Sequence, residues 1–149
     1  MDEFLEVLRS LPGVLELAPE AGSEHPAVSW GDHFFYFAPD GEVPTTRQPY
    51  ATIVTKDYPD DASSRLDAPG RWRLNIHVGP ELVAELVDST VADNGEADVF
   101  LAHPLYGAYG WVAIVNPGHR TTARAVELLR EAHIADQRRV ERRNAASGA

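Results

Sequence analysis

The chain has 149 residues, of which 44% are hydrophobic and 24% charged, a composition that excludes a disordered or fibrous protein. It contains no cysteine, which excludes disulfides, thiol nucleophiles, cysteine-ligated zinc and iron–sulfur clusters. The formal net charge of −10 argues against a nucleic-acid partner, because proteins that bind nucleic acid displace counterions with a basic patch.

The N-terminal part of the chain predicts a helix followed by a strand. A helical apolar stripe with Gly13 as a stop predicts a helix over residues 2–11. Residues 14–17 predict a short strand, and residues 18–26 are loop-like. The stripe consists of Phe4, Leu5, Leu8 and Leu11.

The next segment predicts a hairpin and a third strand. Two apolar-rich runs, 27–30 and 33–38, flank Gly31-Asp32, a pair suited to a two-residue hairpin turn. Residues 50–56 alternate and are rich in β-branched side chains, so they predict a further strand of the same sheet. The polar segment 57–70, which contains two prolines, is predicted to be a loop.

The second half of the chain predicts two strands and two helices. Residues 71–78 alternate, which places Trp72, Leu74 and Ile76 on one face of a strand. Pro80 opens a helix that continues to about residue 87, and residues 88–98 form a loop. A strand over 111–115 and a helix over about 121–143 complete the chain.

Because strands and helices do not alternate strictly, the order of elements favours an α+β fold over a parallel doubly wound sheet. We predict a single antiparallel sheet with N-terminal, middle and C-terminal helices packed mainly on one face. Residues 1–143 should form one domain, with residues 144–149 as a frayed tail.

The other face of the 71–78 strand carries the strongest chemical signal. Arg73, Asn75 and His77 form a row of a cation, an amide and an imidazole, spaced about 7 Å apart. Such a row could hold an anionic or carbonyl-bearing ligand. The alternative is the solvated polar face that an antiparallel sheet ordinarily presents.

Two further segments supply candidate binding residues. The segment His103 to Trp111 is rich in aromatic residues and glycine, so His103, Tyr106 and Trp111 could line a site, or the aromatic residues could pack in the core. Lys56 could bind an anion or form a Schiff base if buried, or end a strand in solvent. We expect His103 or Tyr106 to lie within a side-chain length of the Arg73 row, around a cavity.

No motif points to a cofactor or a metal. The sequence lacks the glycine-rich phosphate-binding patterns, HExxH and any pair of histidines at helical spacing, so it predicts neither. The longest apolar runs, of which Phe34 to Ala38 is one, are far shorter than the ~20 residues that span a bilayer, and the N-terminus is acidic where a signal peptide is basic. We therefore expect no membrane partner and a cytoplasmic location.

Four strings together resemble a family of small bacterial proteins known only as a domain of unknown function, over most of residues 25–135. They are SWGDHFFY from Ser29, ATIVTKDY from Ala51, RLNIHVG from Arg73 and HPLYGAYGWV from His103. The element order and Trp111-Val112 are also similar to the MmcQ/YjbR family. That second resemblance implies a double-wing motif and a DNA-binding role.

These observations favour a protein that binds a small metabolite on the sheet face, such as an enzyme or a resistance or tailoring protein of a metabolite pathway. The alternatives are a DNA-binding or regulatory module of the MmcQ/YjbR type and a protein-interaction domain. The sequence leaves open the ligand, whether a reaction occurs, and the oligomeric state.

Overall fold

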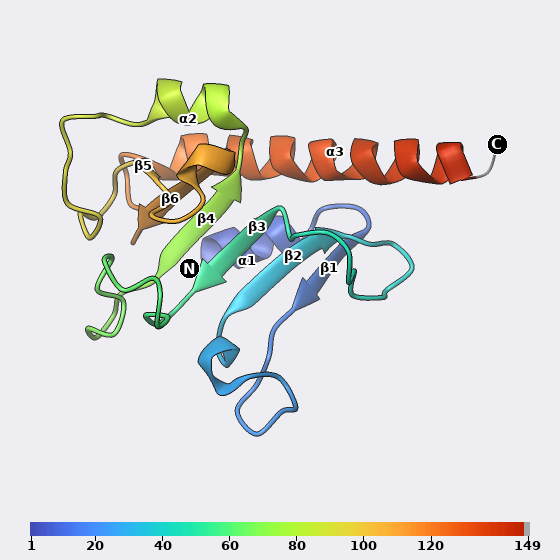
Figure 1. The fold of residues 1–149 in the computed structure, drawn as a ribbon, viewed down its shortest axis with the longest axis horizontal. Helices are drawn as coiled ribbons and strands as arrows, with labels where there is room; N and C mark the ends of the chain where they lie inside the picture. The colour runs from blue at the N-terminus through green and yellow to red at the C-terminus, as the bar shows by residue number, and fades with distance from the viewer. Residues whose placement is uncertain (148–149) are drawn as a thin grey trace.

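The computed structural model describes residues 1–147, which form one six-stranded antiparallel sheet with three α-helices (Figure 1). The strand order is β1-β2-β3-β4-β6-β5, so the last two strands exchange places relative to the chain order. The fold is therefore α+β, as predicted. Its elements are α1 (Asp2–Arg9), β1 (Val14–Leu17), η1 (Ala27–Ser29), β2 (His33–Phe37), β3 (Ala51–Val54), β4 (Arg73–His77), α2 (Pro80–Leu86), β5 (Leu101–Ala102), η2 (Gly107–Tyr109), β6 (Trp111–Val115) and α3 (Thr122–Ser147).

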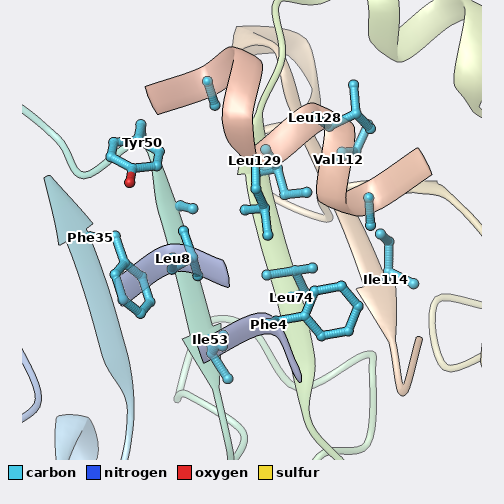
Figure 2. Packing of buried hydrophobic residues seen from close by; sticks show 14 of the residues in the cluster. Phe4, Leu8, Phe35, Tyr50, Ile53, Leu74, Val112, Ile114, Leu128 and Leu129 are labelled. Carbon is cyan, nitrogen blue, oxygen red and sulfur yellow. The ribbon is translucent and has the colours of Figure 1, made fainter. Parts of the chain in front are cut away.

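One face of the sheet packs against the helices and forms the apolar core (Figure 2). Leu74 and Ile76 of β4 are fully buried there, and Trp72 packs at its edge against Phe4, with the ring centroids 6.0 Å apart. The alternation of residues 71–78 therefore predicted the register of β4 correctly. The helices contribute Phe4, Leu5 and Leu8 from α1, Val83 from α2, and Ala125, Leu128, Leu129 and Ala132 from α3.

The predicted hairpin over residues 27–38 is wrong. Residues 27–29 form the 3-10 helix η1, and β2 pairs with β1 on one side and β3 on the other. Gly31 has a φ of 87°, but Asp32 is buried and accepts hydrogen bonds from the end of β3, instead of turning the chain at a hairpin tip. The place beside β2 that residues 27–30 were predicted to fill is thus taken by β1, the short segment Val14–Leu17.

The C-terminal helix is longer than expected. It was predicted to end near Arg143, whereas α3 continues to Ser147 and its last part extends beyond the sheet (Figure 1). Residues 148–149, the rest of the predicted tail, lie outside the described residues. The α3 side chains that line the cleft described below belong to the part of the helix up to Arg143, within the predicted bounds.

Candidate functional site

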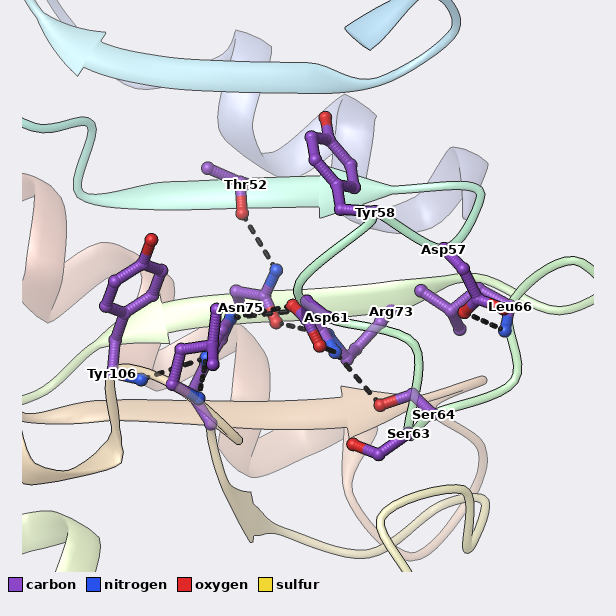
Figure 3. A network of polar contacts seen from close by, with 12 residues as sticks. Thr52, Asp57, Tyr58, Asp61, Ser63, Ser64, Leu66, Arg73, Asn75 and Tyr106 are labelled. Carbon is purple, nitrogen blue, oxygen red and sulfur yellow. Dashed lines mark hydrogen bonds and ion pairs between the residues drawn. The ribbon is translucent and has the colours of Figure 1, made fainter. Parts of the chain in front are cut away.

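The face of the sheet turned away from α1 and α3 is polar, and its centre is buried instead of solvated. Arg73 and Asn75 project from it, and only 2% and 3% of these residues is exposed. The loop of residues 57–70 and the loop of residues 103–110 cover this face; Figure 3 shows the first crossing β4 and Tyr106 of the second standing near it. Leu66 anchors the 57–70 loop by packing against Val54 and Val115.

Arg73 is the centre of a buried hydrogen-bond network (Figure 3). Its guanidinium binds Asp61 through two contacts, of 2.6 and 3.1 Å, and donates to Ser64 Oγ at 2.9 Å. Its Nε donates to Asn75 Oδ1 at 2.8 Å, and Nη2 lies 3.1 Å from His103 Nε2. A guanidinium has five N–H groups, and four of them donate to oxygen atoms of Asp61, Ser64 and Asn75. Arg73 therefore fixes the covering loops, and most of its donors are used within the network.

This network sets the protonation states of Asp61 and His103. Burial opposes ionisation of Asp61, but the hydrogen bonds and positive charge of Arg73 keep the pKa of this carboxyl below its ordinary value. Burial, together with the charge of Arg73, lowers the pKa of His103 to about 4, so its imidazole is neutral at pH 7. The Nδ1 of His103 lies 3.1 Å from the backbone N–H groups of Leu105 and Tyr106, at the turn of the 103–110 loop.

Beside this network, four side chains form what we call the cleft floor: Tyr36, Thr52, Asn75 and His77. Thr52 and Asn75 stand directly opposite each other on β3 and β4, and Asn75 Nδ2 donates to Thr52 Oγ1 at 2.9 Å. His77 Nε2 lies 3.1 Å from the carbonyl oxygen of Tyr109, which can only accept, so this nitrogen carries the ring proton. Burial lowers the pKa of His77, which keeps the ring neutral at pH 7.

The floor belongs to a cleft of about 780 Å³, within the size range of small-molecule sites. Tyr58 and Asp61 form one wall, and Tyr106, Tyr109 and Trp111 form the other. Tyr106 and Tyr109 are exposed, Tyr109 by 72%, so this wall presents two aromatic rings that are open to contact. At the rim lie Arg47, Asp60, Asp136, Arg139 and Arg143.

Six of the seven candidate residues from the sequence line this cleft: Arg73, Asn75, His77, His103, Tyr106 and Trp111. The expected meeting of the two polar segments is confirmed by the contact of 3.1 Å between Arg73 Nη2 and His103 Nε2. Trp111 lies opposite His77 in the sheet, with the ring centroids 5.5 Å apart.

Lys56, the seventh candidate, lies outside the cleft. Its Nζ donates to the backbone oxygen of Trp30 and lies 3.1 Å from Asp32 Oδ1. Asp32 also accepts a hydrogen bond of 2.5 Å from the hydroxyl of Tyr58, and burial together with this bond raises the pKa of that phenol. Lys56 thus balances a buried carboxylate that positions one wall of the cleft.

Sequence reasoning missed Tyr36, Thr52, Tyr58 and Asp61. The alternation of residues 33–38 and 50–56 could have placed Tyr36 and Thr52 on the polar face, because side chains two apart share a face of a strand. Nothing in the loop sequence indicates that Asp61 reaches Arg73, because this contact depends on the path of the whole 57–70 segment.

Neither a membrane-spanning helix nor a metal cluster is present in the part of the chain that the structure describes. No helix within residues 1–147 combines the length and apolarity needed to cross a bilayer. In the same range, no three histidine, aspartate or glutamate side chains come together in a way that could hold a metal ion.

Comparison with known proteins gives a family and no activity. A family model described as "Family of unknown function (DUF6194)" matches residues 1–145, which is nearly the whole chain. No curated protein and no solved structure matches the chain.

Proposed function

This chain belongs to DUF6194, a family of unknown function, and from that premise we propose that it binds a small organic molecule in the cleft between its two covering loops. The observation that carries the proposal is the combination of the 780 Å³ cleft with polar atoms that have no partner on its floor. Concave sites of this size, with apolar walls and a few convergent polar groups, are the usual form of small-molecule sites.

The buried ion pair supports the same function. Burying two charges costs several kcal/mol, and apolar side chains of similar volume would often stabilise a fold equally well. Here the contacts of Arg73 with Asp61 hold the 57–70 loop and its contact with His103 holds the 103–110 loop, a placement that apolar contacts specify less sharply. A rigid second layer of this kind is what a binding site needs to keep its floor and walls in place.

Fluorine NMR of the protein labelled with fluorotryptophan tests the proposal. Of the three tryptophans, Trp111 lines the cleft, whereas Trp72 packs on the core and Trp30 donates to the backbone oxygen of His25. A library of small polar and aromatic metabolites is added to the labelled chain. We expect ligands to shift the Trp111 resonance, assigned with Trp111→Phe, and to leave the other two unchanged.

A pair of variants serves as the control. Thr52→Leu fills the centre of the floor and should abolish the shift of Trp111, while Thr45→Leu, at an exposed threonine outside the cleft, should retain it. The proposal is rejected if no compound shifts Trp111 selectively, or if Thr52→Leu binds as the parent does.

A further inference from the structure

On the basis of the proposed function, we infer that the ligand is a neutral, planar compound that presents an N–H beside a carbonyl group, as in a lactam or cyclic imide. The inference rests on which atoms of the cleft floor remain without a partner, and on the charge around them.

The floor offers hydrogen-bond donors at its centre. Thr52 Oγ1 accepts from Asn75, which leaves its own O–H to donate, and Asn75 Nδ2 uses one of its two N–H groups in that bond. Tyr36 adds a phenol, whose pKa is raised by burial, so it stays a donor at neutral pH. These groups fit a carbonyl oxygen.

Next to these donors, the floor offers an acceptor. Because Nε2 of His77 carries the ring proton, its Nδ1 is a lone-pair acceptor, and no side chain or backbone group within residues 1–147 donates to it. In the described part of the chain, Ser23 Oγ is the only buried side-chain polar atom without a partner, so the partnerless Nδ1 of His77 is accessible from the cleft. It fits an N–H group of a ligand.

The floor is electrically neutral. The charges of Arg73 and Asp61 compensate each other through two hydrogen bonds, and the imidazoles of His77 and His103 are uncharged at pH 7. At the floor a carboxylate would therefore meet no uncompensated cation, and it would face the lone pair of His77; the arginines of the cleft, Arg47, Arg139 and Arg143, lie at its rim. The net charge of −10 also repels anions from the whole chain. A neutral ligand suits this floor better than an anion.

The walls favour a flat apolar body. Tyr106, Tyr109 and Trp111 stand along one side of the cleft, and Tyr106 lies against the imidazole of His103, with the ring centroids 4.8 Å apart. Aromatic rings of this kind gain most from contact with another planar group. A ring with the N–H and carbonyl on one edge would direct that edge to the floor and its faces to these side chains.

A triplet of probes on one ring system tests the inference: carbostyril, a bicyclic lactam; N-methylcarbostyril, which lacks the N–H; and quinaldate, which replaces the lactam by a carboxylate. Affinities are measured by titration of the Trp111 fluorine resonance. We expect carbostyril to bind about tenfold or more tightly than N-methylcarbostyril, because one hydrogen bond to His77 is lost. Quinaldate should bind more weakly than carbostyril.

Variants separate the hydrogen bond from steric effects of the methyl group. His77→Phe keeps a ring beside Trp111 but removes the acceptor, so the affinity ratio of carbostyril to N-methylcarbostyril should fall to about one. His119→Phe, at an exposed histidine outside the cleft, should keep the ratio. Thr52→Val, which removes a donor to the carbonyl, should weaken both lactams by the same factor.

The inference is overturned if quinaldate binds most tightly, if the ratio survives in His77→Phe, or if the library yields ligands of the cleft while carbostyril does not bind. In these outcomes the proposed function stands, because the cleft still takes a small molecule. If no compound of any class binds in the cleft, both proposals fall.

Discussion

Alternate residues of β4 are buried in two different environments, one on each face of the sheet. Leu74 and Ile76 point into the apolar core beneath α1 and α3, and Arg73 and Asn75 point into the polar network beneath the covering loops, yet all four are buried. Apolar burial stabilises the fold by roughly 25 cal/mol per Å² and depends little on direction. The buried ion pair is favourable only when its hydrogen bonds are in place. The apolar face thus stabilises the fold, and the polar face fixes the positions of the covering loops.

Removing the charge partner should produce the largest effect. We expect Arg73→Ala to lower the free energy of unfolding by about 3–5 kcal/mol, because Asp61 is left buried without its partner. Urea unfolding followed by circular dichroism measures this change. On the other face, Leu74→Ala should cost about 2–5 kcal/mol through lost contacts and a cavity.

On the polar face, a second substitution should restore the stability that the first one removes. A double variant, Arg73→Met with Asp61→Leu, removes both charges and should regain most of the stability that Arg73→Ala loses. If the double variant is as unstable as the single one, the ion pair is not what distinguishes this face. The double variant should nevertheless lose ligand binding, because apolar contacts do not hold the 57–70 loop in the same place.

The same contrast explains what the sequence could predict. The alternation in residues 71–78 predicted that Leu74 faces the core, because period-two patterns reflect burial on one face. It also placed Arg73 and His77 on the other face. Whether that face is solvated could not be predicted, because the answer depends on Asp61 and His103, which lie in loops distant in the chain. The hairpin at residues 27–38 was mispredicted for a similar reason: the buried hydrogen bonds of Asp32 to Thr55 are not a local signal.

Lowering the pH should reduce the stability of the fold through His103, which is buried on the polar face. The pKa of His103 is lowered to about 4 from its ordinary 6.5. Between these two pH values the unfolded chain binds a proton at His103 that the folded chain does not, so stability falls as the pH drops through this window. At about 1.4 kcal/mol per unit, the loss amounts to at most about 3 kcal/mol by pH 4. His77, whose pKa is also lowered, adds to the loss in the same direction.

Urea unfolding at several pH values between 4 and 7 measures this dependence. His103→Asn keeps a polar acceptor near the turn but does not titrate, so it should flatten the curve. His119→Asn, at an exposed histidine, should leave the curve unchanged. An equally steep curve in His103→Asn would show that other groups cause the loss. Asp61 acts at lower pH, because its pKa lies below the ordinary 3.8.

The last effect on stability concerns a glycine that holds the 103–110 loop. Gly110 has a φ of 95°, and its carbonyl oxygen accepts hydrogen bonds from the N–H groups of Val78 and Gly79, at 2.8 and 3.0 Å. A Cβ at Gly110 would lie 2.7 Å from the Cα of Gly79, so alanine would push the loop away from the end of β4. Gly22 has a similar φ of 85° but no atom within 4 Å of its Cβ position.

Because both glycines occupy the left-handed region, each alanine substitution carries the same backbone penalty of about 1–2 kcal/mol. We expect Gly22→Ala to cost only this amount in urea unfolding, and Gly110→Ala to cost about 1 kcal/mol more, since the loop must shift. Equal costs for the two variants would mean that the loop moves without resistance. Displacing Tyr106 and Tyr109 opens one wall of the cleft, so Gly110→Ala should weaken ligand binding more than its effect on stability suggests. Gly22→Ala should leave binding unchanged. This pair of results would show that ligand binding depends on the position of the 103–110 loop and not on the overall stability of the fold.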